Sequence, residues 1–63
     1  MDLSPKAILQ IAKDNGWVLR RINGSHHLFK HPETGKAVPI PIHGNKDLKL
    51  GTFKAIQKLL EQK

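Results

Sequence analysis

Residues 17–31, WVLRRINGSHHLFKH, predict the β-hairpin around which the rest of this chain is arranged. The segment 17–22 is rich in residues that favour strands, and Asn-Gly-Ser at 23–25 is a hairpin turn signal. The segment 26–31 is then the returning strand. Two strands joined by so short a turn are antiparallel neighbours.

The returning strand places two adjacent histidines on opposite faces of the sheet. Successive strand residues alternate in direction, so His26 shares a side with Leu28, and His27 shares a side with Phe29. We expect Phe29 to fill the core, His27 to lie at the core margin, and His26 to lie on the open face. The alternative, with Leu28 inward, exchanges the two histidines.

A first helix is predicted before the hairpin. Ser4 is a hydroxyl N-cap and Pro5 suits the first helical position. The helix should run to about Asn15, where Gly16 supplies the left-handed residue that commonly ends a helix. Its apolar stripe consists of Ile8, Leu9, Ile11 and Ala12.

A third strand and a second helix are predicted after the hairpin. After a turn at 32–36, the segment 37–42 looks extended, but Pro39 and Pro41 restrict it to an edge of the sheet. A loop at 43–50 leads to a helix capped by Thr52 or Gly51. Its predicted buried stripe is Phe53, Ile56, Leu59 and Leu60.

These elements predict an α+β fold in one domain, residues 1–63. The order is helix, three antiparallel strands, helix, with both helices on one face of the sheet as a two-layer sandwich. The other face stays open to solvent or to a partner. A chain of this length buries only about 60% of its unfolded surface, so its core is thin.

Composition points to a polyanionic partner. Eleven Lys and Arg against five Asp and Glu give a formal charge of +6, which steers a protein toward nucleic acid. The alternative is that the charge merely keeps the protein soluble. Only three aromatic residues are present, too few for a single-strand stacking platform. The absence of cysteine excludes disulfides and thiolate zinc sites and fits a reducing compartment.

No apolar run approaches the roughly 20 residues that span a bilayer. The start, Met1-Asp2-Leu3-Ser4, lacks the basic region of a signal peptide. We therefore expect a soluble cytoplasmic protein without a membrane partner.

The histidine pair has one catalytic and several other interpretations. An unperturbed imidazole titrates at a pH of about 6.5 and can take the proton of a ribose 2′-hydroxyl while cations hold the phosphate chain. Histidines are also common half-buried filler residues. A zinc site is disfavoured because no carboxylate or thiolate lies at a recognised spacing, although imidazoles are available at His26, His27, His31 and His43. A serine triad is disfavoured because Ser25 lacks the Gly-x-Ser-x-Gly context, and turn chemistry explains it better.

The chain resembles the HicA (YcfA-like) toxins of bacterial toxin-antitoxin systems over nearly its whole length. No single shared piece of sequence is decisive, but the order and spacing of the pieces together are specific to this family. These pieces are Gly16-Trp17, Arg20-Arg21-Ile22-x-Gly24-Ser25-His26-His27-x-Phe29-Lys30-His31-Pro32, Val38-Pro39, Lys46-Asp47-Leu48, Gly51-Thr52 and Ile56.

The resemblance implies a fold similar to a double-stranded-RNA-binding domain and the activity of an mRNA interferase. Such a toxin of a type II system is a ribosome-independent, metal-independent endoribonuclease without a cofactor, which blocks translation until a HicB-like antitoxin neutralises it. It implies His26 as the catalytic residue, with His27 as second choice. The residues expected to contact RNA are Arg20, Arg21, Ser25, Lys30, Lys36, Lys46 and Lys49.

Two alternatives to the ribonuclease remain open. One is a non-catalytic module that binds double-stranded RNA, and the other is a degenerate toxin that only binds its antitoxin. The first predicts salt-sensitive binding of duplex RNA without cleavage. The second predicts tight complex formation without toxicity.

Overall fold

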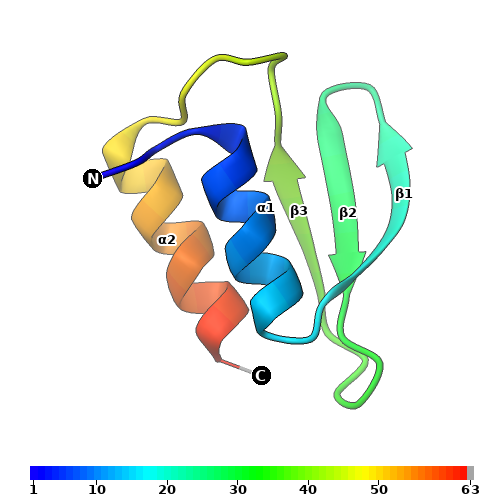
Figure 1. Ribbon diagram of the computed structural model, residues 1–63. Coiled ribbons are helices and arrows are strands. Elements are labelled where there is room, and N and C mark those ends of the chain that lie inside the picture. Colours follow the sequence, from blue (N-terminus) through cyan, green and yellow to red (C-terminus); the bar gives the residue numbers. More distant parts are fainter. Residues whose placement is uncertain (63) are drawn as a thin grey trace.

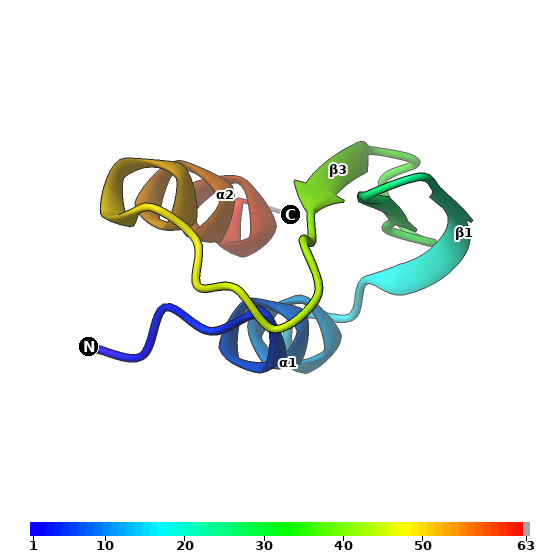
Figure 2. The same cartoon turned by 90° about the horizontal axis from the view of Figure 1, so that it is seen from above.

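The computed structural model describes residues 1–62, and its elements follow the predicted order (Figure 1). These are α1 (Pro5–Asp14), β1 (Val18–Asn23), β2 (His26–Lys30), β3 (Ala37–Pro41) and α2 (Leu50–Glu61). The strands form one antiparallel sheet in the order β1-β2-β3. Both helices lie on the same side of it, and β1 is the strand farthest from α2 (Figure 2). This α+β two-layer arrangement is consistent with the expected fold of a double-stranded-RNA-binding domain.

The ends of α1 are stabilised as its capping residues predict. The hydroxyl of Ser4 accepts a hydrogen bond from the amide of Ala7 at 3.1 Å. At the other end Gly16 has φ +85°, and the amide of Trp17 donates to the carbonyl of Ala12 at 3.0 Å. This is the Schellman arrangement, which supplies donors to the last carbonyls of a helix. The chain is thereby turned out of α1 into β1.

One continuous apolar core fills the space between the helices and the sheet. Phe29 and Ile40 contribute the largest inward side chains of the strands, and both are almost fully buried. The indole Nε1 of Trp17 donates to the carbonyl of Leu60 at 2.8 Å, which joins the start of the sheet to the end of α2. The buried core residues are Ile8, Ala12, Trp17, Phe29, Val38, Ile40, Leu48, Phe53, Ile56 and Leu60.

The second helix differs from its prediction at two points. Its N-cap is Lys49, which makes no side-chain capping bond, so the predicted caps at Gly51 and Thr52 are wrong. The helix starts earlier because the carbonyl of Lys49 already accepts the amide of Phe53 at 2.8 Å. Leu59 was predicted to be buried but is half exposed, because it lies outside the narrow arc of Phe53, Ile56 and Leu60 that faces the core.

The strands match their predicted limits to within one residue, and β3 is an edge strand as its prolines require. Gly24, with φ +60°, and Ser25 form the two-residue turn of the hairpin. No helix within residues 1–62 is long and apolar enough to cross a membrane.

Candidate nucleic-acid interface

His26 and His27 face opposite sides of the sheet, as strand alternation predicts. His26 begins β2, directly after the hairpin turn, and lies opposite Asn23 on β1 and Pro41 on β3. His27 lies opposite Ile40, which is fully buried. Residues paired across antiparallel strands share a face. His27 is therefore on the helix side, and His26 is on the open side.

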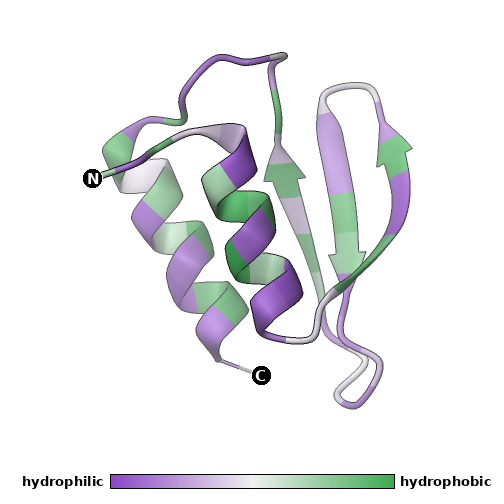
Figure 3. Ribbon diagram, in the orientation of Figure 1, coloured by the Kyte–Doolittle hydropathy of each residue, from purple (hydrophilic) through white to green (hydrophobic). Residues whose placement is uncertain are grey.

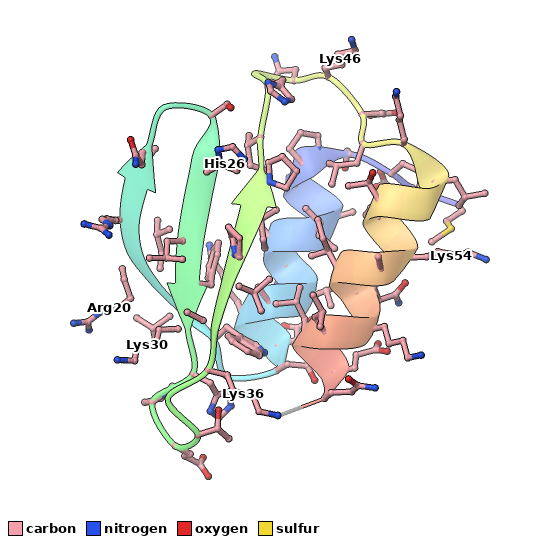
Figure 4. The ribbon with its side chains drawn as sticks, turned by 180° about the vertical axis from the view of Figure 1, so that it is seen from behind. Arg20, His26, Lys30, Lys36, Lys46 and Lys54 are labelled. Atoms are coloured by element: carbon pink, nitrogen blue, oxygen red, sulfur yellow. The ribbon has the colours of Figure 1, made fainter. Side chains whose placement is uncertain are left out.

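The two rings differ in what surrounds them. His26 is exposed and lies at the hairpin-turn end of β2 (Figure 4). Its ring makes no hydrogen bond with any of residues 1–62. His27 is half buried, and its Nδ1 lacks both solvent contact and a partner among the described residues. Leaving such a nitrogen unpaired costs roughly 1–3 kcal/mol. Of the two, only His26 presents a ring that solvent and a large ligand can reach freely.

His31 has a structural position. It is almost fully buried, and its ring meets that of Trp17 edge to face at a centroid distance of 5.3 Å. Nδ1 accepts the amide of Glu33 at 3.2 Å, so the proton of the neutral ring resides on Nε2, which donates to the carbonyl of Asn15 at 3.1 Å. Both nitrogens are therefore occupied within the protein.

An irregularity in β1 decides which way its arginines point. Leu19 pairs with Phe29 and Arg21 pairs with Leu28, so Arg20 is an extra residue opposite β2, a β-bulge. Regular alternation from Leu19 would turn Arg21 toward the helices. The bulge resets the alternation, so that Arg21 shares the open face with Leu28.

The first group of cations lies at the end of the open face away from the hairpin turn. Arg20 and Lys30 line one shallow surface pocket together with Val18 and Pro32. Figure 4 shows both charged ends reaching outward at this end of β1 and β2. With Arg21 on the same face, this group concentrates three positive charges.

The second group lies near His26, in the loop before α2. A surface pocket there is lined by Pro41, His43, Lys46, Asp47, Leu48, Lys49 and Thr52. Pro41 connects the pocket to the site because it is the cross-strand partner of His26. The first turn of α2 has no acidic residue, so the partial positive charge of the helix end adds to the two lysines. His43 and Thr52 were not among the predicted RNA contacts. Their place in the pocket follows from the path of the loop and the early start of the helix.

Two predicted contacts lie apart from these groups. The ammonium of Lys36 lies 3.5 Å from the carbonyl of Gln62, beside the C-terminal end of α2 and at the opposite end of the sheet from His26. Ser25 lies in the turn beside His26, where its carbonyl accepts the amide of Ile42 at 2.6 Å. The structure therefore brings Ser25, but not Lys36, close to the histidine.

Within residues 1–62 no three His, Asp or Glu side chains gather as metal ligands would. The available groups are instead the exposed imidazoles of His26 and His43, which make no side-chain hydrogen bond within residues 1–62, and the flanking cations. Such a set suits proton transfer beside a bound polyanion.

Comparison with known proteins gives one family assignment. A family model described as the HicA toxin of bacterial toxin-antitoxin matches residues 5–62, from the first residue of α1 to just past α2. A comparison with curated proteins gives no match.

Proposed function

This chain belongs to the HicA family of toxins from bacterial toxin-antitoxin systems, and we propose that it acts there as an endoribonuclease that cleaves mRNA and blocks translation. Membership implies an antitoxin partner, which we take to be HicB-like. The reaction takes place in the cytoplasm, where mRNA is translated. The exposed, hydrogen-bond-free ring of His26 between two groups of cations is the observation that supports this proposal most strongly.

The proposed reaction needs no metal or cofactor. The neutral imidazole of His26 takes the proton of a ribose 2′-hydroxyl, and the 2′-oxygen attacks the adjacent phosphorus. The bond from phosphorus to the 5′-oxygen of the next nucleotide breaks, and that oxygen takes a proton from water. The imidazolium of His26 gives its proton to the hydroxide that remains, which restores the neutral ring. The products are a 2′,3′-cyclic phosphate and a free 5′-hydroxyl.

The cations serve to hold the RNA chain and to stabilise negative charge on the phosphate. Lys46 and Lys49 line a pocket together with Pro41, which is the cross-strand partner of His26. The charge that develops at phosphorus is best stabilised by such fixed neighbours. Arg20, Arg21 and Lys30 bind flanking phosphates further along the open face, and each neutralised phosphate releases counterions.

Three residues have less direct roles in this scheme. Ser25 is beside His26 and offers a hydroxyl to the sugar or phosphate there. Lys36 meets only RNA that extends beyond Lys30, since it sits at the far end of the sheet. His27, on the helix side of β2, is the second choice for proton transfer and needs a change of strand or ring position to meet the RNA.

The decisive experiment compares cleavage of a purified RNA by the wild-type protein and by His26→Gln. We expect cleavage to fall by at least about 100-fold in the variant, the usual range for loss of a general base. An otherwise identical RNA with 2′-deoxy sugars at the mapped cut sites should resist the wild type. Equal cleavage by the variant would falsify the role of His26.

Binding without cleavage would point to the alternatives. A wild-type protein that binds duplex RNA with strong salt dependence and yields no products is a non-catalytic RNA-binding module. One that binds neither duplex nor single-stranded RNA but holds its antitoxin is a degenerate toxin.

A further inference from the structure

The helix side of β1 carries an apolar surface that the helices leave uncovered. Leu19 pairs with Phe29, and Ile22 pairs with His27, so both side chains are on the core side of the sheet. Yet 42% of Leu19 and 57% of Ile22 are exposed. Figure 2 shows the reason, since β1 curves away from α2 at the far edge of the sheet. In Figure 3, β1 carries green, hydrophobic bands toward both of its ends.

The same strand has a free backbone edge. β1 pairs only with β2, and its other edge has no backbone partner among residues 1–62. All six of its residues are exposed. An unpaired edge is a template onto which another strand can be added, with main-chain hydrogen bonds giving affinity and alternate side chains giving specificity.

The bulge gives the two sides of this edge opposite characters. Leu19 and Ile22 make the helix side apolar, while Arg20 and Arg21 both belong to the open side. A strand that continues the sheet must match this division with its own alternating residues. Its inward residues should be apolar, and its outward residues should be acidic.

We propose that the antitoxin binds by adding a strand of alternating apolar and acidic residues to the free edge of β1. The apolar residues cover Leu19 and Ile22, and the acidic ones pair with Arg20 and Arg21. The proposal goes beyond the ribonuclease reaction and does not depend on it, because it needs only the antitoxin partner that family membership implies.

The charge of the β1 edge favours an antitoxin strand over a second copy of the chain and over RNA. A second copy of the chain, paired edge to edge, would bring four guanidinium groups together on one face of a protein that already carries +6. Like charges placed directly opposite across strands are destabilising. RNA matches the arginines but gains little from exposed Leu19 and Ile22, which a protein strand covers.

The test measures affinity of the full chain for its purified cognate antitoxin by calorimetry. Every version of this chain, including the reference, carries His26→Gln, so that growth arrest does not limit its production. Calorimetry then measures binding to the antitoxin alone. We expect Ile22→Thr and Leu19→Thr each to raise the Kd by at least about tenfold, or 1.4 kcal/mol. Threonine is β-branched and favours a strand, so neither substitution should weaken β1 through its strand preference. Leu59→Thr, at an equally exposed apolar position on α2, is the control and should change the Kd by less than about twofold.

Hydrogen exchange gives the second readout. Amides of β1 should exchange at least about tenfold more slowly in the antitoxin complex, since strand addition gives outward amides new acceptors. The proposal is overturned if Ile22→Thr and Leu19→Thr bind as the control does, or if protection appears elsewhere and not on β1. It is equally overturned if these substitutions weaken self-association or RNA binding while leaving antitoxin affinity unchanged.

Discussion

The carbonyl oxygen of Asn15 lies 3.1 Å from Nε2 of His31, so the end of α1 is tied to the residue that follows β2. The ring also accepts the amide of Glu33. These bonds hold the helix, the sheet and the second turn in one arrangement. They also use both nitrogens, which separates this buried histidine from the exposed His26.

Replacing His31 by Ala should therefore lower the free energy of unfolding by about 2–4 kcal/mol, through a cavity beside Trp17 and two lost hydrogen bonds. Urea unfolding followed by circular dichroism measures the change. His43→Ala, in an exposed loop, is the control and should shift stability by less than about 0.5 kcal/mol. Equal stabilities of the two variants would refute the structural role of His31.

Gly16→Ala tests the close approach of α1 to the same ring. A Cβ at this position would lie 3.2 Å from Nε2 of His31, and the alanine would have to adopt φ +85°. We expect a loss of stability of about 1–2 kcal/mol. Gly24→Ala shares the positive φ but meets no atom within 4 Å, so it should cost less. If contact with the His31 ring contributes to this loss, Gly16→Ala should cost less stability in a His31→Ala background than in the wild type.

The two adjacent histidines should separate activity from stability. His26→Gln should abolish cleavage yet leave the urea midpoint unchanged, because the ring is exposed and makes no hydrogen bond with residues 1–62. His27→Gln should change stability, since part of its ring lies against the core. A variant of His27 that loses cleavage while keeping its urea midpoint, with His26→Gln still active, would assign the base to His27.

Salt dependence should rank the proposed RNA contacts. Arg20→Gln and Lys30→Gln should each reduce the slope of log K against log salt by about 0.7–0.9, the value for one phosphate contact. Lys36→Gln should give the smallest change on short RNA, because its ammonium lies beside the end of α2. Fluorescence anisotropy between about 50 and 200 mM salt provides the slopes. Identical slopes for all three variants would contradict the placement of the interface on the open face.

Asp2 should titrate below the ordinary range. Hydrogen bonds from the hydroxyl of Ser4, and from its amide at 2.9 Å, lower the pKa of this carboxyl below 3.8. A lowered pKa contributes stability that is present above the unfolded-state value and is lost as pH falls through the folded-state value. NMR titration of the carboxyl should show the lowered pKa, and Ser4→Ala should return it toward 3.8. An unchanged pKa in Ser4→Ala would exclude the bond from the hydroxyl as its cause, since alanine keeps the bond from the amide.

The sequence was enough to predict which side of the sheet each β2 residue faces, because the prediction depends only on which residue of the strand enters the core. Once Phe29 is placed in the core, a period of two residues positions both histidines. The directions of Arg21 and Ile22 could not be predicted in the same way. They depend on the bulge at Arg20, and no glycine or other local signal marks it.

The start of α2 shows a different limit. Gly51 and Thr52 are good caps by their own chemistry, but the structure begins the helix at Leu50. Just before it, the buried side chain of Leu48 and its amide bond to the carbonyl of Leu3, at 2.9 Å, anchor the loop. Contacts distant in sequence thus override the local capping preference, and they bring Lys46 and Lys49 to the pocket beside the histidine.

The bond from the indole of Trp17 to the carbonyl of Leu60 spans 43 positions of the chain. A nascent chain on the ribosome cannot close this contact, or bury the last turn of α2, until residue 60 has been made and has emerged. Folding that relies on such long-range pairing is completed late. The part of the core that joins the sheet to α2 is therefore closed only when both partners of this contact are available, whatever has folded before.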